Sequence, residues 1–118
     1  MPLTQLARSQ WQAYFDRVSK AIGATRVQIE VVGLGLGDQM EADFIPLFGL
    51  SYDPKNDLLA VIAEGVDHLI RHPKQIHVDH ELDWLHSIEA VDAENNRHII
   101  LLKGPLALPA AGAPPSTP

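Results

Sequence analysis

Four of the six histidines lie close together along the chain, and imidazole rings are common metal ligands. His68, His72, His77 and His80 fall within thirteen residues, accompanied by Asp67, Asp79 and Glu81. Histidine and carboxylate groups hold zinc and related metals. If residues 75–81 form a strand, His77 and Asp79 share one face and His80 points to the other. We keep a metal site as an alternative prediction, with these ligands: His72, His77, Asp79 and His80.

The same stretch holds the one local concentration of positive charge in the sequence, around "RHPK". Such a group contacts a carboxylate or phosphate of a partner, or it is solvated surface. Trp84, in "ELDWLHS", lies between two expected strands, where an indole covers one end of a barrel or anchors an interface. The predicted binding residues are therefore Arg71, His72, Lys74, His77 and Trp84.

A glycine-rich stretch, "VVGLGLGDQM" at residues 31–40, resembles a phosphate-binding loop. A dinucleotide fingerprint requires G-x-G-x-x-G, whereas the spacing here is G-x-G-x-G, and Asp38 follows where it would repel a phosphate. We interpret Gly33, Gly35 and Gly37 as a sharply bent strand end, where glycine allows an unusual φ or a close backbone approach.

Two further candidate sites lack residues that their chemistry requires. "DPKNDLLAVIAE" has carboxylates at three calcium-loop positions, but Lys55 replaces a ligand and Leu58 replaces the turn glycine, so a hairpin turn fits better. None of the five serines lies in a nucleophile elbow, and no pair of carboxylates stands out. The sequence therefore gives no positive indication of enzymatic activity or of a bound cofactor.

The amino-acid composition limits which classes of protein the chain can belong to. The chain has 118 residues, 46% of them hydrophobic, which suits one globular domain. It has no cysteine, so disulfides and thiolate sites are excluded. The net charge of −6 makes nucleic acid a disfavoured partner. Because we find neither a signal peptide nor a run of about 20 apolar residues, we expect no membrane association and a cytoplasmic location.

The first element that must position these residues is a helix. Five apolar residues share one helical stripe: Trp11, Tyr14, Phe15, Val18 and Ile22. The spacing predicts a helix over about 9–23, with Ser9 and Gln12 as a capping box and Gly23 as the stop.

Strands are expected from residue 25 onward. Val27, Ile29 and Val31 alternate with polar residues, and a second extended segment, 41–52, contains Pro46, which predicts an edge or a break. Segments 58–63 and 75–81 follow, and 87–92 and 97–102 form a hairpin. We expect an α+β fold: an N-terminal helix followed by five or six antiparallel strands in a strongly curved sheet or partly open barrel. The domain spans 1–105, and 106–118 form a flexible Pro/Ala-rich tail.

Several segments together are similar to a family of small bacterial proteins catalogued only as a domain of unknown function. They are "SQWQAYFDRVSKAIG", "VQIEV", "GDQMEADFIPLFGLSYDPKND", "DHLIRHPKQIHV" and "SIEAVDAENNRHIILL", covering about residues 6–105. The resemblance implies one bacterial domain and carries over no catalytic or binding residue.

The leading hypothesis is a non-catalytic binding or assembly module, which meets another protein or itself through an exposed strand edge or an aromatic patch. The alternatives are the metal site above and nucleic-acid binding through Arg71 and Lys74. The latter rests on a helix followed by five strands, an element order similar to that of Sm-like RNA-binding rings, and the acidity of the chain opposes it.

Overall fold

The computed structural model describes residues 3–33, 35, 37–81 and 84–107. Within them lie eight strands, a short 3-10 helix and one α-helix. In chain order they are β1 (Thr4–Gln5), η1 (Arg8–Gln10), α1 (Trp11–Ala21), β2 (Arg26–Gly33), β3 (Gly37–Asp53), β4 (Leu58–Ala63), β5 (Val66–Arg71), β6 (Pro73–Glu81), β7 (Trp84–Asp92) and β8 (Arg97–Ala107).

All eight strands join one antiparallel sheet in the order β1-β6-β7-β8-β2-β3-β4-β5. The predicted α+β fold, a helix followed by five or six strands, is therefore wrong: the chain is mostly strand, and β1 precedes the helix. The antiparallel pairing is confirmed. The two strands beyond the predicted six are β1, which is too short to show alternation, and β5, which ends just before Pro73.

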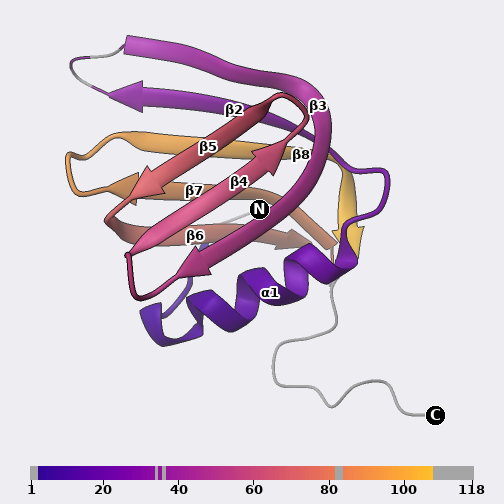
Figure 1. Ribbon diagram of the computed structural model, residues 1–118, viewed down its shortest axis with the longest axis horizontal. Coiled ribbons are helices and arrows are strands. Elements are labelled where there is room, and N and C mark those ends of the chain that lie inside the picture. Colours follow the sequence, from indigo (N-terminus) through magenta and orange to yellow (C-terminus); the bar gives the residue numbers. More distant parts are fainter. Residues whose placement is uncertain (1–2, 34, 36, 82–83, 108–118) are drawn as a thin grey trace.

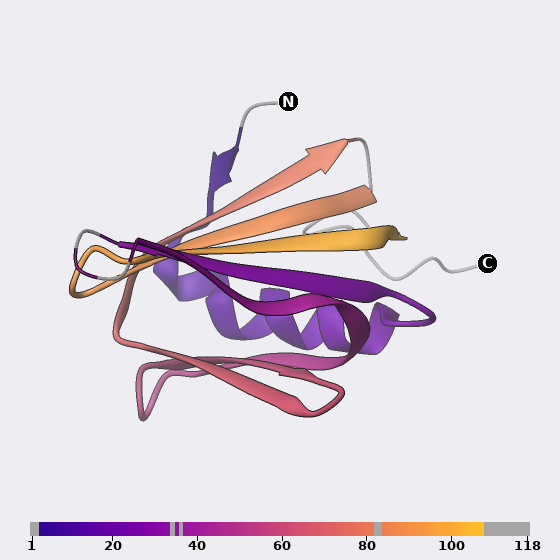
Figure 2. The same ribbon diagram turned by 90° about the horizontal axis from the view of Figure 1, so that it is seen from above.

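β3 folds the sheet into two layers (Figures 1 and 2). It pairs with β2 as far as Pro46 and with β4 from Leu47 onward. The carbonyl of Pro46 accepts from the N–H of Glu64 at 3.0 Å, so Pro46 already faces the turn after β4, and Phe44 turns the backbone at a φ of 56° just before this change. The break expected at Pro46 is thus a bend at which β3 changes partner. The first part of β3 lies in one layer with β2, β8, β7 and β6, and the second part lies in the other with β4 and β5.

α1 lies alongside the space between the two layers (Figure 2). Its buried residues, Trp11, Tyr14, Phe15 and Val18, are four of the five on the predicted stripe and join the single hydrophobic core. The helix begins later than expected because η1 precedes it. Its N-cap is Gln10, which makes no side-chain capping hydrogen bond, so the predicted capping box is wrong.

The glycines at the β2–β3 turn allow a bend and a close approach, as predicted. Gly33 pairs with Gly37, and Gly37 has a φ of 67°. A Cβ on Gly33 would lie 2.0 Å from Oδ1 of Asn96, which belongs to the turn between β7 and β8. That hairpin is also confirmed.

The last described strand extends past the predicted domain limit. β8 runs to Ala107, with Leu106 buried, two residues beyond the predicted domain limit at 105. The rest of the predicted tail, 108–118, lies outside the described residues. Among the described residues, no helix has the length and hydropathy needed to cross a membrane.

Candidate functional site

β5 forms one end of the sheet. It pairs with β4 over its whole length without a register shift. Glu64 and Gly65 form the turn between them, and Gly65 has a φ of 76°, which glycine adopts without steric cost. In the part of the chain that the structure describes, no strand pairs with the other side of β5, which we call its free edge. Figure 2 shows β5 in the layer below the larger part of the sheet.

The register shows which backbone groups of β5 point to the free edge. The N–H of His72 donates to the carbonyl of Asp57 at 2.8 Å, one position beyond the two strands, so this is a hydrogen-bonded pair. Hydrogen-bonded and non-hydrogen-bonded pairs alternate in an antiparallel ladder. Every second residue of β5, beginning with Val66, therefore bonds to β4. The residues whose N–H and C=O groups point outward are Asp67, Leu69 and Arg71.

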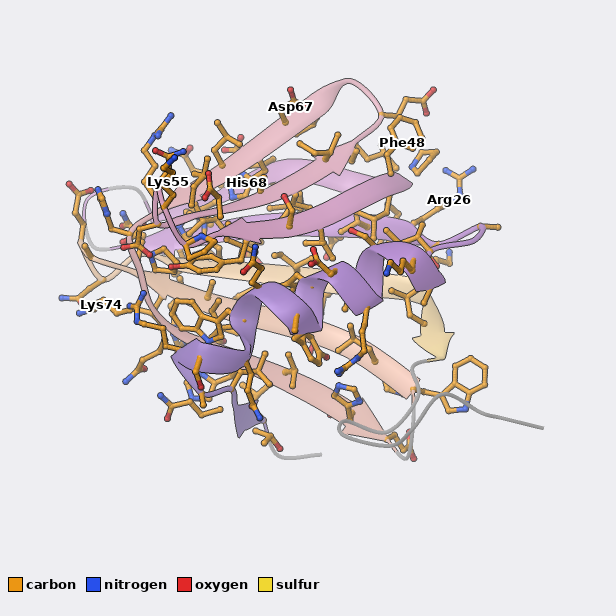
Figure 3. The ribbon with its side chains drawn as sticks, turned by 60° about the horizontal axis from the view of Figure 1, so that its bottom comes forward. Arg26, Phe48, Lys55, Asp67, His68 and Lys74 are labelled. Atoms are coloured by element: carbon orange, nitrogen blue, oxygen red, sulfur yellow. The ribbon has the colours of Figure 1, made fainter. Side chains whose placement is uncertain are left out.

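The side chains of these three residues lie on the outer face of β5 and are exposed, Leu69 to 41%. Their neighbours across the ladder are the apolar residues Ile62, Ala60 and Leu58 of β4. Figure 3 shows Asp67 pointing away from the body of the molecule and His68 pointing toward it. Among the described residues, neither Asp67 nor Arg71 has an ion-pair partner. The outer face of β5 is thus charged at both ends and apolar in the middle.

The strand at the opposite end of the sheet exposes far fewer unpaired backbone groups. β1 has two residues, Thr4 and Gln5, which pair with Val78 and His77 of β6. After Leu6, whose N–H donates to the Ile76 carbonyl at 2.8 Å, the chain turns into η1. A strand this short exposes few unpaired backbone groups.

His68 fixes the inner face of β5 to the other layer. Its Nε2 lies 2.9 Å from Nδ1 of His98 on β8, and Nε2 of His98 lies 3.0 Å from Oδ2 of Asp92 at the end of β7. Because a carboxylate only accepts, Nε2 of His98 donates to Asp92; when the His98 ring is neutral, its Nδ1 has no proton and accepts from His68. Asp92 also accepts from the backbone N–H groups of Glu94 and Asn96. This histidine relay links β5, β8 and the β7–β8 turn.

The pKa values follow from these contacts. Burial, and then the neighbouring His98, lower the pKa of His68, with a smaller opposing effect from Glu41. Burial of Asp92 favours a higher pKa, but hydrogen bonds from His98 and the turn outweigh it, so the pKa of Asp92 is lowered. Both shifts favour a neutral His68 at one end of the relay and an ionised Asp92 at the other.

A second polar group surrounds Arg8 in η1. Its Nη1 donates to the hydroxyl of Tyr52 and to Oδ1 of Asp57, both at 3.2 Å, and its Nη2 donates to the Pro73 carbonyl at 2.9 Å. The guanidinium carbon lies 4.3 Å from the centre of the Trp11 ring. Arg8 therefore joins η1 to the β3–β4 turn and to the start of β6. A cavity of about 490 Å³ lies here, lined by Arg8, Ser9, Gln12, Tyr52, Pro54 and Asp57.

Asp57 is the centre of this group. Tyr52 donates to its Oδ1 at 2.6 Å, and Nδ1 of His72 lies 3.2 Å from its Oδ2. The Tyr52 hydrogen bond is the main reason that the pKa of Asp57 is lowered, whereas burial and then Asp57 raise the pKa of Tyr52. Asp57 and His72 have φ values of 50° and 54°, so both hold an unusual backbone. Asp57 accepts from Arg8 and Tyr52 and lies beside His72, so these contacts hold the β3–β4 turn in place, which fits a structural role.

The predicted binding residues lie in separate surroundings. Arg71 is on the outer face of β5, His72 contacts Asp57, and Lys74 donates to the side chain of Asn95. His77 lies on β6 opposite Glu89. Trp84, 48% exposed, pairs with Glu81 at the far end of β6 from Lys74. Of these five residues, only Arg71 belongs to the free edge.

The predicted metal ligands are also divided between two faces. His77 and Asp79 alternate with the buried Ile76 and Val78 of β6, whereas Nε2 of His80 lies 2.6 Å from the Tyr14 hydroxyl on α1. Among the described residues, no group of three or more histidine, aspartate or glutamate side chains is placed to hold a metal ion.

Sequence reasoning missed the relay and the Arg8 group because their members are far apart in the chain. His68 and His98 are 30 residues apart, and Arg8 and Asp57 are 49 apart. The strand β5 itself had a partial signal: Val66 and Ile70 fall on one face and Asp67 and Arg71 on the other, directly after the turn residues Glu64 and Gly65, although His68 and Leu69 break the alternation.

Comparison with known proteins gives a family and a relative. The family described as "Family of unknown function (DUF5335)" matches residues 3–111. An uncharacterized protein of Aquifex aeolicus (strain VF5) is 44% identical over 110 residues, which cover 92% of this chain and 99% of the relative. None of the solved structures matches the chain significantly.

Proposed function

The chain belongs to the DUF5335 family of unknown function, and from this premise we propose that it is a non-catalytic protein-interaction domain that binds an extended segment along the free edge of β5. The observation that supports the proposal is the edge itself, a strand of six residues with one side unpaired. An added strand satisfies outward N–H and C=O groups by backbone hydrogen bonds, and its side chains set the specificity.

The properties of β5 favour binding over protection. Edge strands are commonly protected by proline, by charged side chains and lysine above all, by a bulge or by very short length. The charged residues of β5, Asp67 and Arg71, have opposite signs, so a strand of complementary charge is not repelled. Val66–Arg71 contains no proline or lysine, and its ladder with β4 has no register shift. By contrast, β1 at the other end of the sheet has two residues. The two ends are therefore treated differently, as expected if one of them has a partner.

The other hypotheses have weaker support. The element order behind the similarity to Sm-like rings is absent from the described residues, and the net charge of −6 still opposes nucleic acid. The proposed metal ligands lie on different faces. Our proposal retains the expected cytoplasmic location, and the Aquifex relative supports a bacterial source.

Site-specific photo-cross-linking in cells tests this proposal. A photoreactive residue replaces Leu69, on the outer face of β5, or Lys55, an exposed turn residue that serves as the control position. We expect a discrete cross-linked protein from position 69 and none from position 55. Arg71→Pro removes an outward N–H without removing a bond to β4, so it should strongly reduce the cross-link at 69 while circular dichroism stays unchanged. Equal cross-linking from the two positions in folded protein would overturn the proposal.

A further inference from the structure

We propose that the strand bound by β5 is β5 of a second copy of this chain, in an antiparallel register centred on Leu69. This inference rests on the proposed function and names its partner. It makes the chain a two-fold symmetric dimer whose sheet continues from one copy into the other.

The backbone of β5 permits this register. In a symmetric antiparallel pair centred on one residue, that residue lies opposite its own copy, and residues two positions away on either side lie opposite each other. Centring on Leu69 therefore places Leu69 opposite Leu69 and Asp67 opposite Arg71. These are the residues whose N–H and C=O groups point to the free edge, so each of these pairs is a hydrogen-bonded pair.

The side chains of β5 are complementary to themselves in the same register. Asp67, Leu69 and Arg71 share the outer face, so the dimer has two Asp67–Arg71 pairs on either side of a Leu69–Leu69 contact. Opposite charges directly across a ladder stabilise it, and like charges destabilise it. Neither charged side chain has to leave an ion pair within the described part of its own chain to make this contact.

The acidity of the whole chain does not prevent this contact. Each copy has a net charge of −6, which opposes association at long range. The outer face of β5 carries one negative and one positive side chain and is locally neutral. At physiological ionic strength, charges more than about 8 Å apart are largely screened, so the local complementarity dominates at the edge.

The assembly stops at two copies. Pairing β5 with itself uses that edge in both chains, and an isologous contact of this kind closes on itself. The outer ends of the joined sheet are then the two copies of β1, each with two residues. An end strand of two residues exposes few unpaired backbone groups, so these ends offer little for a third copy.

Charge exchange on the full-length chain tests the register. Asp67→Arg and Arg71→Asp each turn both attractive pairs of the dimer into repulsive pairs. The double variant restores the attraction. A mixture of the two single variants also does so, because a dimer with one copy of each has opposite charges across the ladder. We expect the wild type to reach twice the 13.0 kDa chain mass in sedimentation equilibrium. Each single variant should weaken the dimer about tenfold or more. The double variant and the mixture should recover most of the wild-type affinity.

The outcomes separate this inference from the proposed function. Unchanged association of the single variants, or no recovery in either the double variant or the mixture, overturns the register and so this inference. A wild-type chain that stays at 13.0 kDa at every concentration also overturns it. In that case a position-69 cross-link to a different protein leaves the proposed function standing, and no cross-link at all removes both. Circular dichroism of each variant confirms that it is folded.

Discussion

Nε2 of His68 and Nδ1 of His98 lie 2.9 Å apart, and this contact ties the edge strand β5 to β8 in the opposite layer. His98 is 6% exposed, and its other ring nitrogen bonds to Asp92. The inner face of β5 is therefore fixed by this relay, whatever binds along its free edge. The relay therefore gives the proposed binding strand a defined position.

The first prediction concerns the pH dependence of stability. The pKa of His68 is lowered from 6.5 in the folded chain. As the pH falls below about 6.5, the unfolded chain takes up a proton that the folded chain does not, so the stability decreases. We expect the melting temperature to decrease between about pH 7.5 and 5.5, and to decrease less in His68→Gln. His86→Gln, which removes a histidine outside the relay, should retain the full decrease. Equal slopes for wild type and His68→Gln would contradict this.

The second prediction concerns the Asp92 end of the relay. Asp92→Asn removes a charged acceptor that holds His98 and two backbone N–H groups of the turn. Hydrogen bonds to charged groups contribute more than neutral ones, so we expect a loss of about 2 kcal/mol in the free energy of unfolding. Urea denaturation measures it, and the exposed control Asp43→Asn should change stability by less than about 0.5 kcal/mol. A similar small change for both variants would argue against a structural relay.

The third prediction concerns the Tyr52 hydroxyl. Because its hydrogen bond is the main cause of the lowered pKa of Asp57, Tyr52→Phe should bring the pKa of Asp57 back toward its ordinary value. NMR titration of the carboxyl carbons detects the change. Asp53 is the internal control, since its lowered pKa comes mainly from Asn56 and should not move. An unchanged Asp57 titration would show that Tyr52 does not act on it.

The fourth prediction concerns the contact between Gly33 and Asn96. Gly33→Ala places a Cβ 2.0 Å from Oδ1 of Asn96, whose amide is held by Asp92 at 3.2 Å. We expect a loss of about 1–2 kcal/mol in urea denaturation, and a smaller loss when Asn96→Ala is also present. Gly23→Ala, which meets no atom within 4 Å, is the matched control. Equal effects in both backgrounds would mean that Asn96 is not the obstacle.

Local sequence patterns were sufficient for several elements. The helix stripe, the hairpin of β7 and β8 and the glycine bend were predicted because each depends on residues close together in the chain. Pro46 was correctly identified as an interruption. Its consequence, a change of partner from β2 to β4, depends on where distant strands lie and was not deducible from the pattern.

The site depends on such distant contacts. The histidines that are close in sequence separate because His68 faces inward on β5, His72 lies in a connection, and His77 and His80 occupy different faces of β6. The histidine that does meet His68 is His98, from another hairpin. The free edge of β5 depends on the strand order of the whole sheet, which alternation within a segment cannot supply.

The most direct test of pairing between two copies of β5 is hydrogen exchange of its backbone amides, measured by NMR at increasing protein concentration. We predict that the N–H groups of Asp67, Leu69 and Arg71 exchange rapidly in dilute protein and become protected as the concentration rises. Those of His68 and Ile70, which bond to β4, should be protected throughout. Rapid exchange of Asp67, Leu69 and Arg71 at every concentration would contradict the pairing.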